Sequence, residues 1–595
     1  MSLKWDSKNR PPCPTKEIKM EKETLIRNIK IAMKQEQAEL VIKNCQIVNV
    51  FTHEIETGDI AIDGGLIIGI GNYEGKTNVD ARGKFALPGL IDSHVHVESS
   101  FVTPEEFGRA MVPHGTTTTI SDPHEIVNVC GMEGLDYMLR ASKRTALNIH
   151  YMMPSCVPCT KWEHNGAVIM AEDMRQGLKR DGVLGVGEFM DAYGIIGGDG
   201  DCLDKILMAA EENAIIDGHS PGLAGDMLAG YMVSGIRTDH ECSTIEDMNS
   251  RLRSGMYVQL RLGSAATELY TLADNVTEAN ARRCLLCSDD MHPETILERG
   301  DMDESLRVCV EHGINPITAV QMATINAAEC YHLDDRGAIA PGRRADIVLV
   351  DDLENFKVQK VWIGGELTAE DGKYLKVTEK EDIAPVANSM NVKDFTKEQL
   401  DLKLTTPKAH VIKINPGSLL SDDEVIEVEL DENGLFKFNP ENNIAKISVI
   451  ERHHATGNIA NALIKGYGIK SGAIAVSVGH DSHNIVTVGT TAEDMYFAVN
   501  ELIAQGGGII LAQGGNVLER LELPVAGLMS TLTVEETAEC FDRIRKCAVG
   551  QMGVSSEIDP ILTLCFMALP VIPELKLTDM GLFNVGKQEF IDVQA

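Results

Sequence analysis

The segment Pro88-Gly89-Leu90-Ile91-Asp92-Ser93-His94-Val95-His96-Val97-Glu98 decides the fold of this chain. Its apolar residues predict a buried strand that ends in two histidines. Because side chains alternate between the two faces of a strand, Asp92, His94 and His96 should point the same way. Two imidazoles on one face could hold a divalent transition metal. An isolated pair of this kind is more often two half-buried histidines, so the surrounding sequence has to separate these interpretations.

Downstream of this segment, short apolar stretches recur, and helix-compatible sequence separates most of them. Strands that alternate with helices indicate βα units and a parallel sheet. Eight units within about 245 residues are typical of a (β/α)8 TIM-like barrel, which places the chain in the α/β class. The eight segments are Ala86–Glu98, Thr117–Asp122, Leu147–Ser155, Val183–Met190, Ala214–Ser220, Ile236–Glu241, Met256–Gly263 and Cys284–Asp290.

Titratable residues lie at the carboxyl ends of six of these segments. In a barrel the carboxyl ends of the strands meet on one face, where active sites are built. If these residues had only structural roles, we would expect them at varied positions along the segments rather than at their carboxyl ends. The end residues are His94 and His96, then Asp122, His124 and Glu125, then Glu188, then His219, then Asp239, His240 and Glu241, and finally Asp289 and Asp290. The sequence therefore predicts one metal-binding face.

The sequence outside residues 87–330 predicts further domains. Residues 1–37 form a poorly ordered lead followed by a helix from Glu21 to about Gln35. Residues 38–86 and 331–370 carry strand and turn signals, including Gly64-Gly65 and Gly364-Gly365, and should join into one β-sandwich that flanks the barrel. Residues 371–405 are charged and are expected to be a linker. Residues 406–595 form an additional α+β domain with mixed helix and strand signals.

The composition excludes some classes of protein. The formal net charge of −35 argues against non-specific binding to nucleic acid or to an anionic membrane. The sequence contains no apolar run long enough to span a membrane and no secretory signal. Its 14 cysteines are irregularly spaced and indicate reduced thiols rather than a disulfide framework. We therefore expect a cytoplasmic protein that acts on a small molecule.

Several polar residues allow more than one interpretation. Asp122, His124 and Glu125 could contact a substrate, support the site or bind an extra ion, or they could cap the start of a helix. Arg261 and Ser264, after the seventh segment, are weaker candidates for substrate contact. The sequence assigns no role to the histidine pairs His453-His454 and His480/His483.

By these residues the chain resembles the amidohydrolase superfamily over residues 38–370. The matching features are Pro88–His96, single histidines after the fifth and sixth strands, an Asp after the eighth, and the closing Pro341-Gly342-x-x-Ala345-Asp346. Many members bridge two metals with a carboxylated lysine after the fourth strand. Here Glu188 occupies that position, which points away from the hydantoinase and dihydroorotase subgroups.

Within the superfamily the chain is similar to the bacterial adenine deaminases over nearly its whole length. The resemblance implies that it hydrolyses adenine to hypoxanthine and ammonia with two divalent metal ions, manganese or iron with zinc as the alternative, and that it forms a homodimer. The similar stretches are His94–Ser100, Asp122–Ile126, Gly187-Glu188, Asp217–Pro221, Thr238–Glu241, Ser288–Asp290 and, in the C-terminal domain, Gly479–Asn484.

The resemblance also implies a set of residue roles. Glu188 would bridge the two ions; His94, His96 and Asp289 would bind one of them, and His219 and His240 the other. A water between the ions would supply the hydroxide that attacks C6 of the purine. Asp289 would take the proton of this water and pass it to the leaving amine.

Two assignments remain open. A second acid must protonate the purine ring, and the candidates are Glu98, Asp122, Glu125 and Glu241. Asp289 is preferred to Asp290 because it would share a strand face with Leu285 and Cys287 if the strand continued without a bulge. Other functions considered are an amidohydrolase for a cyclic amide, an N-acyl compound or another amino-heterocycle, and a catalytically inactive scaffold.

Overall fold

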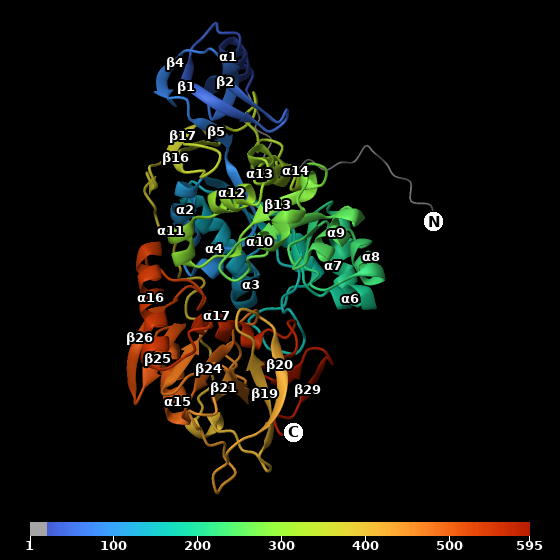
Figure 1. Ribbon diagram of the computed structural model, residues 1–595, viewed down its shortest axis with the longest axis vertical. Coiled ribbons are helices and arrows are strands. Elements are labelled where there is room, and N and C mark those ends of the chain that lie inside the picture. The colour runs from blue at the N-terminus through green and yellow to red at the C-terminus, as the bar shows by residue number, and fades with distance from the viewer. Residues whose placement is uncertain (1–20) are drawn as a thin grey trace.

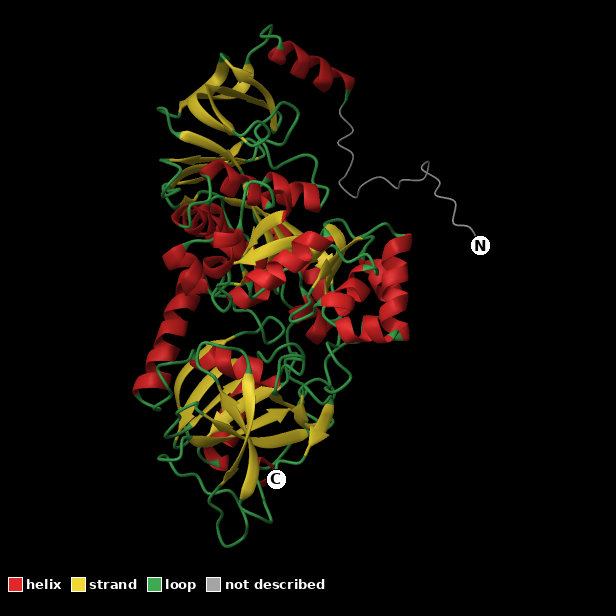
Figure 2. Ribbon diagram, turned by 45° about the vertical axis from the view of Figure 1, so that its right-hand side comes forward, coloured by secondary structure: helices red, strands yellow, loops and turns green. Residues whose placement is uncertain are grey.

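The computed structural model describes residues 21–595, so the predicted N-terminal lead lies outside the described residues. The chain forms an elongated molecule with a β-rich unit at one end, a barrel in the middle and a second β-rich domain at the other end (Figure 1). Figure 2 shows helices gathered around the middle part and strands dominating both ends. The first helix, α1 (Lys22–Ala32), lies within the stretch predicted to be helical.

Residues from both sides of the barrel sequence build one nine-stranded sheet. Antiparallel pairing between β5 and β15 joins the two halves, for example at Leu87 and Val348. Ile42, Ile60 and Trp362 lie in its buried core. The strands are β1 (Ala38–Asn49), β2 (Glu54–Asp63), β3 (Leu66–Gly71), β4 (Gly75–Asp80), β5 (Phe85–Pro88), β15 (Ile347–Val350), β16 (Val358–Ile363), β17 (Glu366–Glu370) and β18 (Lys373–Tyr374).

The two glycine pairs form the tight turns expected from the sequence. Gly64 and Gly65 connect β2 to β3, and Gly364 and Gly365 connect β16 to β17. All four glycines have positive φ, between 56° and 79°, which residues with a side chain adopt only with strain. Two-residue turns with positive φ match the natural twist of paired strands.

The middle of the chain is an α/β TIM-like domain. All eight segments predicted to be strands contain a strand, and most neighbouring strands pair in parallel. Parallel pairing of β14 with β6 links the last strand to the first. The strands are β6 (Leu90–His96), β7 (Thr116–Ser121), β8 (Asn148–Met153), β9 (Val183–Phe189), β10 (Ile215–Gly218), β11 (Thr238–Asp239), β12 (Tyr257–Arg261), β13 (Cys284–Cys287) and β14 (Asp289–Asp290).

Helices follow most of these strands and cover the outside of the barrel (Figure 2). The interval between β10 and β11, which is short in the sequence, holds one helix of eight residues, α8. The helices are α2 (Pro104–Met111), α3 (His124–Cys130), α4 (Met132–Ala141), α5 (Ala171–Gly177), α6 (Ala192–Gly197), α7 (Gly200–Glu211), α8 (Gly225–Met232), α9 (Ile245–Ser254), α10 (Leu269–Leu272), α11 (Pro293–Arg299), α12 (Met302–Glu311), α13 (Pro316–Met322) and α14 (Ile325–Cys330).

The C-terminal part is a mixed α and β domain. Its largest sheet has eight strands in the order β20-β19-β22-β21-β24-β23-β25-β26, and α15 packs on one face of that sheet. The elements are β19 (Lys408–Ile414), β20 (Ser421–Glu427), β21 (Ile444–Ile450), β22 (Ile459–Lys465), β23 (Ala473–Val476), β24 (Ile485–Gly489), α15 (Ala492–Ala504), β25 (Gly508–Gln513), β26 (Asn516–Glu522), α16 (Val534–Gly550), α17 (Pro560–Cys565), β27 (Leu575–Thr578), β28 (Gly581–Asn584) and β29 (Glu589–Ile591).

The C-terminal domain and the barrel are in direct contact. The segment between them, residues 371–405, touches both: Glu381 pairs with Arg144 of the barrel at 3.0 Å, and the carbonyl of Val386 accepts a hydrogen bond from Ala526. The backbone N–H of Ser530 also donates to the carbonyl of Phe101 at 2.7 Å. None of the helices in residues 21–595 is both long enough and apolar enough to cross a bilayer.

Candidate metal centre

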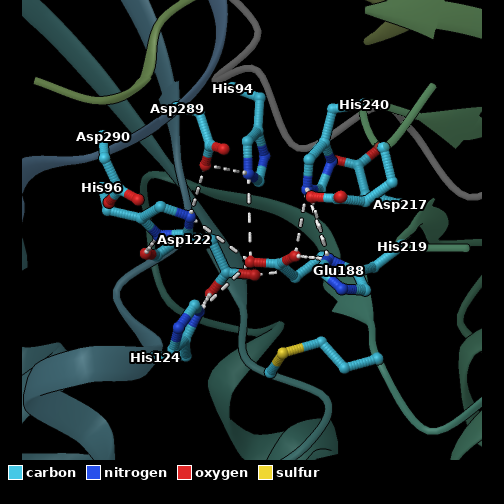
Figure 3. Close-up of polar contacts among 12 residues, drawn as sticks. His94, His96, Asp122, His124, Glu188, Asp217, His219, His240, Asp289 and Asp290 are labelled. Atoms are coloured by element: carbon cyan, nitrogen blue, oxygen red, sulfur yellow. Dashed lines mark hydrogen bonds and ion pairs between the residues drawn. The ribbon is translucent and has the colours of Figure 1, made fainter. Parts of the chain in front are cut away.

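The residues predicted at the strand ends come together around Glu188. Figure 3 shows its carboxylate between two groups of histidines. These residues lie at the carboxyl ends of the barrel strands. We call this set the Glu188 cluster, and every member except the partly buried His219 is buried. Its members are His94, His96, Glu188, His219, His240 and Asp289.

One oxygen of Glu188 faces the first strand of the barrel. Its Oε1 lies 3.3 Å from Nε2 of His96 and 3.9 Å from Nε2 of His94. Oδ1 of Asp289 lies 3.2 Å from Nε2 of His96 and 3.6 Å from that of His94. Two imidazoles and two carboxylates from β6, β9 and β14 therefore surround one point.

The other oxygen of Glu188 faces the opposite side. Its Oε2 lies 2.7 Å from Nδ1 of His219 and 3.2 Å from Nε2 of His240. Oε1 of Glu241 lies 3.4 Å from the same nitrogen of His240. Because the two oxygens of Glu188 face different pairs of histidines, this carboxylate can contact two cations at once.

Electrostatics keep the carboxylates of the cluster in the form that binds cations. Burial alone would raise the pKa of Glu188, but hydrogen bonds with His219 and His240 lower it well below its usual value. The pKa of Asp289 is also held well below its usual value, since His94 and His96 outweigh the effect of burial. Both side chains are therefore anionic at neutral pH.

The donor set fits divalent metal ions. Nε2 of His94 is buried and has no hydrogen-bond partner in residues 21–595, and burial lowers the pKa of this histidine. A neutral imidazole nitrogen without a partner is the form that ligates metals. Nitrogen and carboxylate ligands at close spacing suit zinc, iron or manganese rather than calcium, which prefers oxygen ligands alone. Three-residue groups able to hold an ion include His94-His96-Asp289 and His94-Glu188-His240.

Asp122 supports the cluster from the end of β7. Its Oδ2 accepts a hydrogen bond of 2.9 Å from the backbone N–H of Glu188. Its carbonyl lies 2.9 Å from Nδ1 of His96, which leaves Nε2 of that ring to face the site. The alternative interpretation of Asp122 and Glu125 as a helix cap is wrong, because α3 begins after Pro123 and has no side-chain cap.

A buried ion pair fixes the loops that carry His219 and His240. Arg251 on α9 is fully buried and donates through Nε to Oδ2 of Asp239 at 2.9 Å. Its Nη2 also donates to the carbonyl of Ser220 at 2.6 Å. Since Ser220 follows His219 and Asp239 precedes His240, one guanidinium positions both strand ends.

The argument that placed Asp289 in the site assumed a continuous strand, and that assumption is wrong. The strand is interrupted between β13 and β14, and Asp289 has a φ of +65°. This left-handed conformation is unfavourable for a residue with a side chain. Asp289 nevertheless faces His94 and His96, whereas the carboxylate of Asp290 accepts a hydrogen bond from Ser99.

The other predicted residues lie at different distances from the cluster. Arg261 pairs with Glu241, and its Nη1 lies 2.9 Å from Oδ2 of Asp289, so this side chain borders the Glu188 cluster directly. Burial raises the pKa of Glu98 to about 7, and its Oε1 accepts a hydrogen bond from the backbone of Ile126. Ser264 is turned toward Thr295, with which its hydroxyl forms a 2.8 Å hydrogen bond.

Glu125 faces the C-terminal domain rather than Glu188. Its Oε1 lies 2.6 Å from Nδ1 of His480, and its Oε2 pairs with His483. The His453-His454 pair makes structural contacts, with Nε2 of His453 2.7 Å from the carbonyl of Ser482. The position of Glu125 after the second strand marked it as a candidate site residue, but the sequence could not show that its partners are histidines of the C-terminal domain.

His124 is the residue that the predicted ligand set lacked. Its Nδ1 lies 3.4 Å from Oε1 of Glu188, and its Nε2 lies 3.5 Å from Oε1 of Glu125. His96, His124 and Glu188 form another group able to hold an ion, as do His124, Glu125 and Asp481. The sequence feature that could have identified His124 is its position directly after the second strand, close to Asp122. At such a position the sequence does not distinguish a residue that caps a helix from one that binds a metal.

Comparison with protein families agrees with this fold. Residues 85–368 match the model of the amidohydrolase family, and residues 418–589 match that of the adenine deaminase C-terminal domain. The barrel with its Glu188 cluster is therefore an amidohydrolase domain.

Curated relatives resemble the chain over nearly its entire length. An adenine deaminase 2 of Desulfotalea psychrophila is 52% identical, covering 97% of this chain and 100% of its own. The adenine deaminases of Ligilactobacillus salivarius and Clostridium acetobutylicum are 47% and 46% identical, covering 96% and 95% of this chain and 99% of each relative. The chain belongs to the adenine deaminase family.

Proposed function

We propose that this enzyme hydrolyses adenine to hypoxanthine and ammonia. The observation that carries the proposal is the position of Glu188, whose two oxygens face His94 and His96 on one side and His219 and His240 on the other. The identity of the substrate is inferred from relatives that are named adenine deaminase and that match nearly the whole chain.

The residues present fit two divalent ions per chain. His94, His96 and Asp289 would hold one, His219 and His240 the other, and Glu188 would contact both. Manganese or iron is proposed, with zinc as the alternative, since all three accept imidazole and carboxylate ligands. Bound there, the ions would supply an activated water at neutral pH.

Protein side chains move the protons of the reaction. Asp289 is anionic and adjoins His94 and His96, so it can accept the proton of the attacking water and deliver it to the leaving amine. Arg261, 2.9 Å from Oδ2 of Asp289, restricts that carboxylate to one orientation. Oδ2 of Asp122 accepts a hydrogen bond from the backbone of Glu188, and both oxygens of Glu241 accept from Arg261. Glu125 pairs with His480 and His483, so we favour Glu98 as the acid for the purine ring.

An assay of ammonia release tests the function. The full chain, loaded with manganese, is incubated with adenine, other aminopurines, aminopyrimidines and a set of cyclic and N-acyl amides, while elemental analysis measures bound metal. We expect ammonia and hypoxanthine from adenine at the highest kcat/KM. Faster hydrolysis of an amide, with adenine untouched, would assign the chain to another amidohydrolase activity.

The wider setting is also part of the proposal. All cysteines in residues 21–595 are free thiols, which suits the reducing cytoplasm. Exposed apolar side chains around helices α6–α8, among them Tyr193, Leu207 and Val233, offer a surface for a homodimer, which sedimentation velocity would detect. The proposed domain division is 38–86 with 331–370, 87–330 and 406–595, with residues 371–405 as the linker.

A further inference from the structure

A narrow cavity lies between the barrel and the C-terminal domain. Each of the two domains supplies half of the residues that line it. Figure 1 shows α3 of the barrel and α17 of the C-terminal domain at this boundary. Small-ligand sites occur preferentially at the interface between domains, which is where this cavity lies.

The cavity adjoins the Glu188 cluster. Three of its carboxylates are Glu98, Glu125 and Asp290. Glu98 follows His96 by two residues, Glu125 follows His124, and Asp290 follows Asp289. Figure 3 shows Asp290 beside His96 at the edge of the cluster. A molecule in the cavity would thus lie against the metal-binding face.

A carboxylate on the barrel side of the cavity has an oxygen without a hydrogen-bond partner in residues 21–595. Oε2 of Glu98 is buried and makes no hydrogen bond to the described residues, although Oε1 accepts one from Ile126. A buried polar atom left unpaired destabilises the protein. Such an atom in the wall of a cavity indicates a ligand that brings a hydrogen-bonding group, as the N–H groups of a purine would.

On the C-terminal side, His480 is held by a carboxylate and by an aromatic ring. Its Nδ1 lies 2.6 Å from Oε1 of Glu125, and its ring stacks on Phe566 with centroids 4.4 Å apart. Because Glu125 engages Nδ1, Nε2 is the ring nitrogen left for a ligand. The cavity also has apolar walls from Phe101, Leu562 and Cys565, which suit the flat faces of an aromatic heterocycle.

We infer that the purine ring binds in this cavity and that His480, a residue of the C-terminal domain, helps to select it by hydrogen bonding through Nε2. The C-terminal domain then forms part of the substrate site itself. This inference rests on the proposed function, because it takes the ligand to be a purine. It assigns His480 to substrate binding and leaves metal binding to the barrel.

The first test replaces His480 with Asn in the full, manganese-loaded chain. An Asn side chain can keep the hydrogen bond to Glu125 but removes Nε2. We expect KM for adenine and the inhibition constant of hypoxanthine to rise about tenfold or more, with kcat changed only a few-fold and bound metal unchanged. The control is His410→Asn in the same domain, where Nδ1 pairs with Asp423 at 2.7 Å away from the cavity. Constants of H480N within twofold of this control would overturn the inference.

A second variant keeps the test decisive if H480N fails to fold. Leu562 is partly buried at the cavity wall, so Leu562→Trp can fill the cavity without touching the Glu188 cluster. We expect retained metal and a large rise in KM; an unchanged KM would contradict the proposed pocket.

If the parent chain releases no ammonia from adenine, the proposed function fails. Equilibrium dialysis of hypoxanthine against the parent and both variants then tests the proposed pocket independently of activity. Binding that both variants weaken supports it, and binding that neither weakens, or none to the parent, overturns it.

Discussion

Nδ1 of His219 lies 2.7 Å from Oε2 of Glu188, so the ends of the neighbouring strands β9 and β10 meet through one carboxylate. The other oxygen of Glu188 faces His96 at 3.3 Å. A carboxylate in this position links both sides of the site.

Replacing Glu188 with Gln should weaken metal binding. The amide keeps the size of the side chain but loses the charge and one ligand oxygen. We expect the affinity for metal to fall by about 10- to 100-fold or more, with a matching loss of turnover. Elemental analysis after dialysis against a weak chelator measures the change, with Glu212→Gln on the barrel surface as the control. Undiminished metal content and turnover in this variant would contradict the proposal that Glu188 contacts both ions.

Asp289→Asn should separate metal binding from proton transfer. The amide retains an oxygen toward His94 and His96 but cannot accept the proton of the attacking water. We expect kcat to fall by about 10²–10⁴-fold while most of the metal is retained. Steady-state kinetics alongside elemental analysis provide the measurement, and a near-normal kcat would remove Asp289 as the proton carrier.

Arg251→Leu should destabilise the barrel, because it leaves the buried carboxylate of Asp239 without its counter-charge. Removing one partner of a buried ion pair typically costs about 3–5 kcal/mol. We expect Tm to fall by about 10 °C, as recorded by differential scanning calorimetry. Arg253→Leu, at an exposed position on the same helix, is the matched control. Equal Tm values for the two variants would show that the pair contributes little.

Lys576 should make stability depend on pH. It is fully buried on β27, where burial lowers its pKa to about 7 and its Nζ donates to the carbonyl of Leu419. In the unfolded chain a lysine has a pKa near 10.4. Between pH 7 and about 10.4 the unfolded state therefore binds more protons, and stability contributed by this group rises with pH. Below pH 7 both states are protonated and the full cost of burying the charge remains.

Lys576→Met should consequently raise Tm at pH 6, with a gain of up to about 4 kcal/mol in the free energy of unfolding. The gain should shrink as the pH approaches 10. Thermal unfolding of parent and variant from pH 6 to 10 tests this, with the exposed Lys587→Met as control. A gap that stays constant over this range would show that Lys576 does not titrate with a lowered pKa.

Much of the site could be predicted because it depends on local order along the chain. His94 and His96 alternate with apolar residues, and Glu188, His219 and His240 each lie at or directly after the end of a predicted strand. Parallel strands in a barrel bring such ends together whatever the details of the loops. The strand argument chose Asp289 over Asp290, and Asp289 lies beside His94 and His96, although the strand is broken there and Asp289 has a positive φ.

The sequence by itself determined the barrel, the face that carries the Glu188 cluster and most of its members, because strand periodicity and residue order are local properties. Only the tertiary structure decided that Glu125 turns away from Glu188 and meets His480, 355 residues later in the chain. It also decided that His124 faces both Glu188 and Glu125. The contact of Glu125 with His480 depends on how two domains pack against each other, and the contacts of His124 depend on how the chain turns between β7 and α3. No repeat or spacing in the sequence encodes either geometry.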